Sequence, residues 1–216
     1  MRLYLTSHNL GPYTDELLNL VGNGRSALFI ENARDYYPDE RRANDLQEKL
    51  TMLSELGFKV KELNLRNFFG KPNELKAYIR SYGPDLIFAG GGNVFLLATA
   101  YHLSGFDKIL LEDLEMDRYV YGGFSAGTMV LCKTIKVYGH DHLVPERVPE
   151  IYGVDAVMEG LGLVDYQLIP HANEPEHLEM TKIYAERIKK AGLEAFLLNQ
   201  EAAIIINGDT KRILGR

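Results

Sequence analysis

The 216-residue sequence predicts a three-layer α/β sandwich, in which helices cover both faces of a mainly parallel sheet. Short and continuously apolar segments alternate with longer segments of helical period, a pattern typical of parallel strands that are buried on both faces. Near the end of the chain, two strand-like runs flank Asn207-Gly208, a strong signal for a two-residue hairpin turn. We therefore expect an antiparallel C-terminal hairpin on this sheet. The sequence shows no linker or internal repeat, so residues 1–216 are predicted to form one domain.

The individual elements follow from apolar runs and from their boundary residues. The clearest helix is 39–56, where leucines recur at three- and four-residue spacing and Gly57 supplies the stop. Further helices are predicted at 73–82, 94–103 and 175–191, with another helical stretch directly after Ser125. Strands are predicted at 2–7, 26–32, 59–65, 84–93, 117–123 and 162–172. Residues 133–153 have no clear period and are expected to form a loop.

Composition and charge exclude several classes of protein. The formal net charge is −6 and no block of Lys or Arg occurs, so nucleic acid is not expected as a partner. No segment approaches the roughly 20 apolar residues that span a bilayer, and the N-terminal apolar run is too short for a signal peptide. The single cysteine, Cys132, excludes an internal disulfide and lies on an apolar segment, where we expect it to be buried. These observations predict a cytoplasmic protein.

Three unusual segments each follow a predicted strand. They are GGGN (90–93), GGFSAG (122–127) and IPHANEPEH (169–177). The carboxyl ends of parallel strands meet at one edge of a sheet, and ligands of such sheets bind there. We therefore expect these three segments to lie close together, although they are far apart in the sequence.

The chemistry of the three segments suits acyl transfer. Gly123 to Gly127 form a G-x-S-x-G pattern between a strand and a helix, which is the context of a nucleophile elbow with Ser125 at its centre. His171 supplies the kind of base that a serine nucleophile requires, and the glycine-rich turn offers backbone N–H groups to an oxyanion. Each segment also has a plainer interpretation. Residues 90–93 could be a tight turn without a ligand, and 122–127 a crowded strand–helix junction. His171 could be a loop histidine with only a structural hydrogen bond. The sequence contains no nucleotide-binding fingerprint.

A family resemblance rests on the same residues. FAGGGNVFLL (88–97), YGGFSAGTMVL (121–131) and QLIPHANEP (167–175) resemble motifs of the peptidase E family of serine peptidases, S51, in order and at similar spacing. That family includes aspartyl dipeptidase and cyanophycinase, and the resemblance extends over nearly all of the chain. It implies a class I glutamine amidotransferase-like (flavodoxin-like) fold, with serine where those enzymes carry cysteine. It also implies a serine peptidase that needs neither cofactor nor metal.

The resemblance further assigns roles to particular residues. It implies that Ser125 is the nucleophile, His171 the general base and Glu201 the acid that orients the imidazole. Asp141, in GHDH, is a rival third member of this triad. Backbone N–H groups of Ala126 and of Gly91 or Gly92 would hold the oxyanion, and Asn93 and Asp141 are candidates for contacting substrate.

The segment after His171 departs from the family. Aspartyl dipeptidase carries an arginine shortly after the histidine, which reads the aspartate side chain of the substrate. Here the first arginine after His171 is Arg187, and Lys182 is the only earlier cation. Arg147 or Lys136 could substitute, because a site that reads a carboxylate needs a cation or several donors. Cleavage after an N-terminal aspartate therefore stays open.

Two clusters of side chains offer other interpretations. His140, His142, His171 and His177 could bind a metal, although only their spacing favours it, and Tyr36 with Tyr37 could line a cleft. We predict a serine peptidase that acts on small peptides in the manner of a dipeptidase, with a homodimer as one option for its assembly. The alternatives are a ligand-binding or regulatory domain of the same fold without enzymatic activity, and a hydrolase that releases ammonia from side-chain amides.

Overall fold

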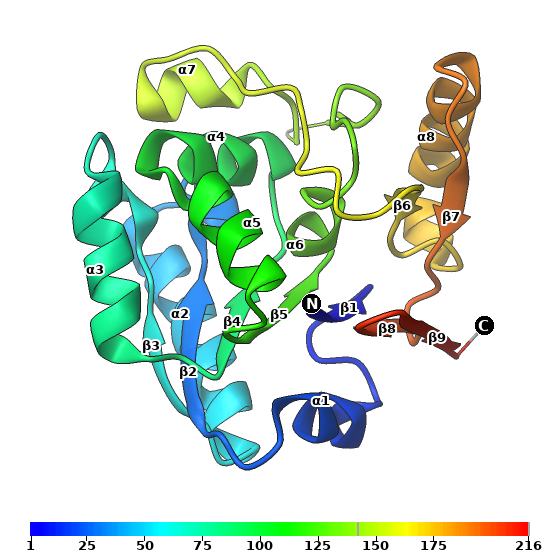
Figure 1. Cartoon of the computed structure of the whole chain (residues 1–216). Coiled ribbons are helices and arrows are strands. Elements are labelled where there is room, and N and C mark those ends of the chain that lie inside the picture. Colours follow the sequence, from blue (N-terminus) through cyan, green and yellow to red (C-terminus); the bar gives the residue numbers. More distant parts are fainter. Residues whose placement is uncertain (142, 216) are drawn as a thin grey trace.

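The computed structural model describes residues 1–141 and 143–215, and Figure 1 shows the arrangement of its elements. The main sheet contains β1 (Arg2–Thr6), β2 (Ser26–Ile30), β3 (Lys59–Glu62), β4 (Leu86–Ala89), β5 (Val120–Phe124), β8 (Ala203–Asn207) and β9 (Thr210–Leu214). Its order is β3-β2-β4-β5-β1-β8-β9. The first five strands of this order are parallel, whereas β8 is antiparallel to β1 and to β9. The predicted parallel sheet and the C-terminal antiparallel hairpin are thus confirmed.

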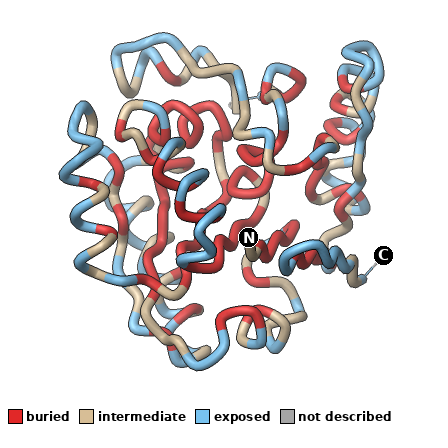
Figure 2. The backbone as a smooth tube through the Cα atoms, in the orientation of Figure 1, coloured by how far each residue is buried: buried red, intermediate tan, exposed pale blue. Residues whose placement is uncertain are grey.

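Helices form a layer on each face of the sheet. The helices between the strands are α1 (Thr14–Val21), α2 (Asp39–Glu55), α3 (Pro72–Tyr82), α4 (Val94–Ser104) and α5 (Phe106–Glu115). Leucines of α1 and α2 pack on alternate strand residues such as Tyr4 and Phe88, while α3, α4 and α5 pack on the opposite face, against residues such as Leu5 and Ile87. Figure 2 shows the consequence, a continuous buried core along the central strands.

The strand order defines where loops meet. From β2 the chain moves outward to β3, then crosses back to β4 and continues through β5 in the other direction. Such a reversal opens a crevice at the carboxyl ends of the strands. The segments that follow β2, β4 and β5 therefore lie around one crevice, and two of the three unusual sequence segments belong to this set.

The third segment reaches the crevice by another route. The strand predicted at 162–172 is only β6 (Gln167–Ile169), and it pairs in parallel with β7 (Ala195–Leu197) in a separate two-stranded sheet. The expectation that it joins the main sheet is wrong, because β8 occupies the free edge of β1. Helix α8 (Leu178–Lys190) follows η3 (Pro175–His177) and lies against this small sheet (Figure 1).

Several local elements differ from the predicted ones. The helix after Ser125 is a single turn, α6 (Ala126–Met129), because residues 161–164 return and donate backbone hydrogen bonds to carbonyls that a longer helix would use. The predicted loop 133–153 contains a short helix, α7 (Arg147–Tyr152), which lies over α4 (Figure 1). The sequence pattern did not predict α1 or α5. The remaining short elements are η1 (Asn32–Arg34) and η2 (Leu65–Phe68).

No single helix among the described residues is long and apolar enough to cross a membrane. Helices α4 and α5 pass such a test only as a pair, and they are bent by 83° relative to each other.

Candidate active site

Ser125 occupies a strained turn between β5 and α6. Its backbone has φ 49° and ψ −113°, a left-handed conformation that a residue with a side chain rarely adopts. The neighbouring glycines allow the turn to be this tight: a Cβ on Gly123 would lie 2.7 Å from the carbonyl oxygen of Gly127, and a Cβ on Gly127 would collide with the Ala89 carbonyl. The Ser125 N–H donates to the Thr6 carbonyl (3.3 Å), which holds the turn against β1. The local geometry is that of a nucleophile elbow.

The glycine-rich turn after β4 passes directly beside this elbow. A Cβ on Gly91 would lie 3.1 Å from the Cβ of Ser125, and one on Gly92 would lie 2.5 Å from the Ala33 carbonyl. Gly92 has φ 138°, which is open to glycine but not to other residues. The missing side chain of Gly91 therefore allows the turn to approach Ser125, and that of Gly92 allows it to approach the segment after β2.

Asn93 ends the same turn and has a structural role. Its Oδ1 accepts hydrogen bonds from the N–H groups of Phe95 (2.9 Å) and Leu96 (3.2 Å), which caps α4. Its Nδ2 donates to the Val144 carbonyl (3.0 Å), and the residue is fully buried. The expectation that Asn93 contacts substrate is therefore corrected, because both ends of its amide are already bound to the protein.

His171 is fixed by hydrogen bonds on two sides. Its backbone has φ 58°, and its N–H donates to the Oγ of buried Ser7 (2.6 Å) at the end of β1. On the ring, Nδ1 lies 2.6 Å from Oε1 of Gln200. An amide oxygen can only accept, so Nδ1 carries the proton and Nε2 keeps its lone pair. This is the tautomer that a general base requires.

The partner of the imidazole differs from the expected one. The side chain of Glu201 is exposed and makes no ion pair or hydrogen bond to His171 among the described residues, so the expected contact is corrected. Residues 199–201 form a turn before β8, closed by a hydrogen bond from Ala202 N–H to the Asn199 carbonyl. The Gln200 N–H is also bound to Oδ1 of Asn173, which fixes Gln200 beside His171. Sequence reasoning chose the carboxylate, but the conformation of this turn presents the amide.

Burial controls the charge of the His171 ring. The pKa of His171 is lowered from 6.5 to about 4, mainly because burial removes the ring from water. The hydrogen bond to Gln200 opposes this shift, and the neighbouring His177 and His8 contribute to it. The ring of His8 lies 6.0 Å from that of His171 and the ring of His177 lies 5.0 Å away. The imidazole is therefore neutral at neutral pH and can accept a proton.

Ser125 and His171 line the same pocket, whose volume is about 240 Å³. Its wall comes from the segment after β2, from the turns after β4 and β5, from residues 133–153, here called the excursion after α6, and from α8. The other lining residues are Arg34, Tyr36, Tyr37, Gly92, Val94, Met129, Tyr138, Gly139, Leu143, Pro170, His177, Met180 and Tyr184. The idea that Tyr36 and Tyr37 line a cleft is confirmed. Sequence reasoning missed Arg34, although it lies only two residues before Tyr36 in the segment after a predicted strand.

Asp141, the rival third member, is directed elsewhere. Its carboxylate pairs with Nε2 of His140 (3.1 Å), and 71% of its side chain is exposed. The proposed contact of Asp141 with His171 or with substrate in this pocket is therefore corrected. In the described ranges, no group of three His, Cys, Asp or Glu side chains could hold a metal ion. His142, which also belonged to the considered histidine cluster, lies outside the described residues.

The cations considered for carboxylate recognition do not line this pocket. Lys136 pairs with Glu159, and Arg147 pairs with Glu150. Arg187 donates to the Gly139 carbonyl (2.8 Å), which joins α8 to the excursion, and Lys182 is exposed. Arg34 is the one Lys or Arg among the described lining residues.

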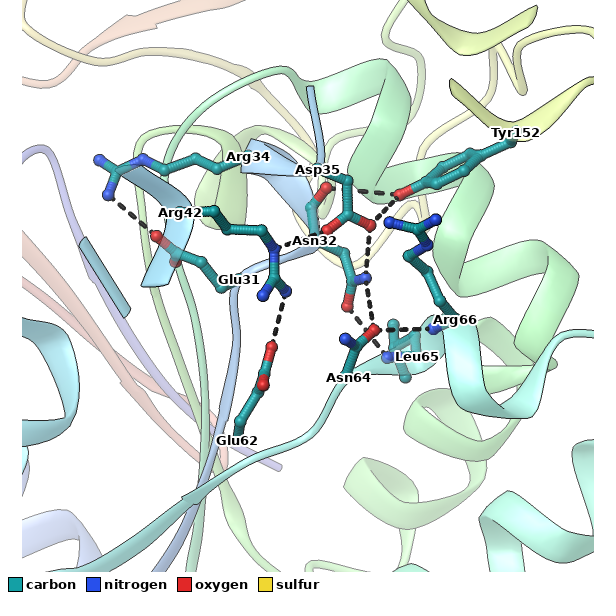
Figure 3. A network of polar contacts seen from close by, with 10 residues as sticks. All are labelled: Glu31, Asn32, Arg34, Asp35, Arg42, Glu62, Asn64, Leu65, Arg66 and Tyr152. Carbon is teal, nitrogen blue, oxygen red and sulfur yellow. Dashed lines mark hydrogen bonds and ion pairs between the residues drawn. The ribbon is translucent and has the colours of Figure 1, made fainter. Parts of the chain in front are cut away.

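A buried polar network holds the segment that carries Arg34 and the two tyrosines (Figure 3). Asp35 accepts hydrogen bonds from Arg42 Nε (2.9 Å), the Tyr152 hydroxyl (2.6 Å) and Asn32 Nδ2 (2.7 Å). Arg34 extends away from this centre and donates to Glu31 (2.9 Å). The network thereby joins β2, α2 and α7 around one wall of the pocket.

Cys132 is buried behind the elbow. Burial raises the pKa of its thiol to about 11, and its Sγ contacts the Tyr138 hydroxyl and the Leu168 N–H. Such a thiol is held protonated, so it is a poor nucleophile.

Fold and site together define a class of protein: an amidotransferase-like α/β enzyme that carries a serine at the strand–helix elbow. A family model described as peptidase family S51 matches residues 4–214, and the chain belongs to this family. Membership makes it a serine peptidase by class, a hydrolase of peptide bonds.

Two curated relatives from Listeria support the assignment. The chain is 30% identical over 165 residues to "Uncharacterized peptidase Lmo0363" of Listeria monocytogenes serovar 1/2a, which covers 74% of this chain and 75% of that protein. It is also 30% identical over 167 residues to "Uncharacterized peptidase Lin0382" of Listeria innocua serovar 6a, with 73% and 75% covered.

Solved structures share the fold. A crystal structure of a protein assigned to peptidase E in Listeria monocytogenes EGD-e superposes with a TM-score of 0.75 at 23% identity, covering 98% of this chain and 96% of that one. The crystal structure of a peptidase from an acI-B1 Actinobacterium gives 0.68 at 18% identity, with 100% and 87% covered. The class I glutamine amidotransferase-like fold is thus confirmed.

Proposed function

We propose that this protein hydrolyses small peptides through an acyl-enzyme on Ser125, with His171 as the general base. The observation that carries the proposal is the shared pocket. Ser125 enters it from a strained elbow, and His171 enters it as a neutral imidazole whose Nδ1 proton is bound by Gln200. These are the parts that an activated serine nucleophile needs.

The reaction follows from these positions. Nε2 of His171 takes the proton of the Ser125 hydroxyl while the Ser125 oxygen attacks the peptide carbonyl. The His171 ring then gives that proton to the leaving amine. Water cleaves the acyl-enzyme by the same transfer. Backbone N–H groups of Ala126 and of Gly91 or Gly92 hold the oxyanion, since the glycine turn lies against the elbow. Loss of one such donor raises the barrier by about 3 kcal/mol.

Gln200 takes the place in which a carboxylate was expected. Its amide oxygen fixes the tautomer and orientation of the ring, which are the main duties of the third group in a triad. A neutral amide supplies less stabilisation to the imidazolium that forms in the transition state. We therefore assign the positioning role to Gln200 and not to Glu201.

The pocket favours short substrates. Its volume of about 240 Å³ is below the usual range for drug-sized ligands, and it accommodates little more than one or two side chains. A dipeptidase-like activity on small peptides fits this size.

A fluorophosphonate probe, followed by intact-protein mass spectrometry, tests the nucleophile. We expect one covalent adduct on the wild-type protein, its complete loss in Ser125→Ala, and normal labelling in Ser54→Ala, a control on the exposed surface of α2. Hydrolysis of a dipeptide library should fall by about 10⁴-fold or more in Ser125→Ala. Equal labelling of Ser125→Ala, or no labelling of a folded wild-type sample together with no hydrolysis, would refute the proposal.

A further inference from the structure

The pocket beside Ser125 is built mostly from large apolar and aromatic side chains. Tyr36 and Tyr37 come from the segment after β2, and Tyr138 comes from the excursion after α6. Helix α8 adds Met180 and Tyr184, which are four residues apart and therefore share one face of the helix. A pocket of this composition stabilises a ligand by removing apolar surface from water.

Arg34, the one Lys or Arg among the described lining residues, is paired through one end of its guanidinium, while its Nε has no hydrogen-bond partner. The guanidinium of Arg34 lies 2.9 Å from buried Glu31 and 3.5 Å from Asp45. If this guanidinium turned to a substrate carboxylate, the side chain of Glu31, which is fully buried, would lose its partner. A buried carboxylate without a partner is strongly unfavourable.

Helix α8 offers no cation to the pocket. Its basic side chains lie elsewhere: Lys182 is exposed, and Arg187 is bound to the carbonyl of Gly139. The α8 residues that do reach the pocket are Met180 and Tyr184. An acidic side chain in this pocket would therefore be desolvated, and the one Lys or Arg that it could meet among the described lining residues is Arg34, which is already paired with Glu31 and Asp45.

We propose that the pocket selects peptides with a large apolar or aromatic side chain next to the scissile bond and rejects an acidic one. This inference rests on the proposed function, in which a peptide occupies the pocket beside Ser125. It assigns to Met180, on α8, a role in determining specificity. One extra or missing methylene in a hydrophobic pocket changes discrimination between substrates by about 10- to 200-fold.

Binding to the full-length Ser125→Ala protein tests the selection without cleavage. Calorimetric titrations would compare Phe-Ala, Leu-Ala and Asp-Ala, and the reversed series Ala-Phe, Ala-Leu and Ala-Asp, at pH 8. Burial raises the pKa of Glu31 to about 7, so this pH keeps its carboxylate charged and paired with Arg34. We expect the apolar peptides of at least one series to bind at least tenfold more tightly than the acidic peptide. Equal or tighter binding of the acidic peptides, or no measurable binding of any peptide, overturns the inference.

Two substitutions on α8 form a matched pair. Met180→Lys, in the Ser125→Ala background, places a cation in the pocket and should improve binding of the acidic peptide at least tenfold while weakening that of the phenylalanine peptide. Leu178→Lys introduces the same charge on the same helix at a position that is 45% exposed. It should change the binding of neither the acidic peptide nor the phenylalanine peptide. Met180→Ala, a milder change, should weaken only the apolar peptides. Unchanged ranking in folded Met180→Lys and Met180→Ala contradicts the inference.

Hydrolysis by the wild-type protein separates this inference from the proposed function. If apolar peptides bind more tightly but the protein neither hydrolyses them nor is labelled at Ser125, the proposed function is refuted and the proposed selectivity is retained. Preferred hydrolysis of the acidic dipeptides would support the function and refute the selectivity.

Discussion

Two residues with unfavourable backbone conformations line the pocket of the candidate site. Ser125 (φ 49°) and His171 (φ 58°) both adopt the left-handed region without being glycine. Strain of this kind persists only where surrounding contacts impose it. Here the contacts are the glycines of the elbow and the Ser7 hydroxyl, which binds the His171 N–H. The positions of the proposed nucleophile and base are thus maintained by the folded structure around them.

Substitutions of the adjacent residues Gln200 and Glu201 show which of the two orients the His171 ring. We expect Gln200→Ala to lower kcat by about 100-fold, because a ring without its Nδ1 partner can rotate or change tautomer and so loses much of the general-base contribution. Glu201→Ala should retain near wild-type kcat, because this side chain is exposed. Steady-state kinetics on the best dipeptide measures both. A large loss in Glu201→Ala with full activity in Gln200→Ala would reverse the assignment.

The pH dependence of kcat/KM reports the charge of His171. Its pKa is lowered from 6.5 to about 4, so the neutral base persists well below the usual histidine range. The acid limb of kcat/KM, which reflects the free enzyme, should therefore have its midpoint below pH 6 and near pH 4 to 5. Gln200→Glu should move this limb to higher pH, since a carboxylate beside the ring favours the imidazolium. A wild-type midpoint at 6.5 or above would contradict this prediction.

At the scale of elements, the site depends on how strands end and helices begin. The turn after β4 ends in Asn93, which caps α4 and at the same time binds the excursion at Val144. The turn after β5 leads into the single turn of α6, which ends where the returning segment 161–164 takes over the backbone acceptors. Both short connections are therefore fixed by hydrogen bonds that reach beyond their own elements.

Two substitutions distinguish the cap that Asn93 provides to α4 from its hydrogen bond to the Val144 carbonyl. Asn93→Ala removes the cap and the bond to Val144, and should lower the free energy of unfolding by about 1–2 kcal/mol. Asn93→Asp keeps an acceptor at a helix N-terminus and loses only the donor, so it should fall between Asn93→Ala and the wild type. Urea denaturation followed by circular dichroism measures these differences. A fully stable Asn93→Ala would show that the cap contributes nothing.

At the scale of the whole molecule, the pocket is assembled from parts that are far apart in the sequence. The polar network around Asp35 joins the segment after β2 to α2 and to α7, which belongs to the excursion after α6 (Figure 3). Arg187 joins α8 to the same excursion. The pocket walls are thus connected to one another through buried polar contacts as well as through the apolar core.

Glu31 makes the stability of the whole molecule depend on pH. Burial raises its pKa from 4.5 to about 7, against the opposing effects of Arg34, Arg42 and Lys49. Because the folded protein favours the protonated carboxyl, this group contributes most stability below pH 4.5, and the contribution is lost as pH rises from 4.5 to 7.

Glu31→Gln provides the test of this dependence. Relative to the wild type, the variant should gain on the order of 2–3 kcal/mol of unfolding free energy between pH 4.5 and pH 8. Urea unfolding at the two pH values, expressed as the difference between the variant and the wild type, isolates this group from all others. A difference that does not change with pH would show that Glu31 titrates in its ordinary range.

The sequence allowed the sheet, the hairpin and the meeting of the three site segments to be predicted, because strands, turns and the elbow have local signals. Apolar runs mark buried strands, Asn207-Gly208 marks the turn, and the glycines around Ser125 mark the elbow. The separate pairing of β6 with β7 was not predictable, because the occupation of the β1 edge by β8 is a property of the assembled sheet. Helices α1 and α5 were missed, although each buries one face against the core.

The residues that surround the reacting groups required the folded chain. Local patterns around Ser125 and His171 were enough to mark them as candidates and to suggest acyl transfer, since an elbow and a strand-end histidine have recognisable neighbours in sequence. The choice of Gln200 over Glu201 depends on one turn, and the presence of Arg34, Met180 and Tyr184 in one pocket depends on contacts between distant segments. Backbone conformation over a few residues is encoded locally, whereas the partner of a side chain is set by whichever segment packs against it.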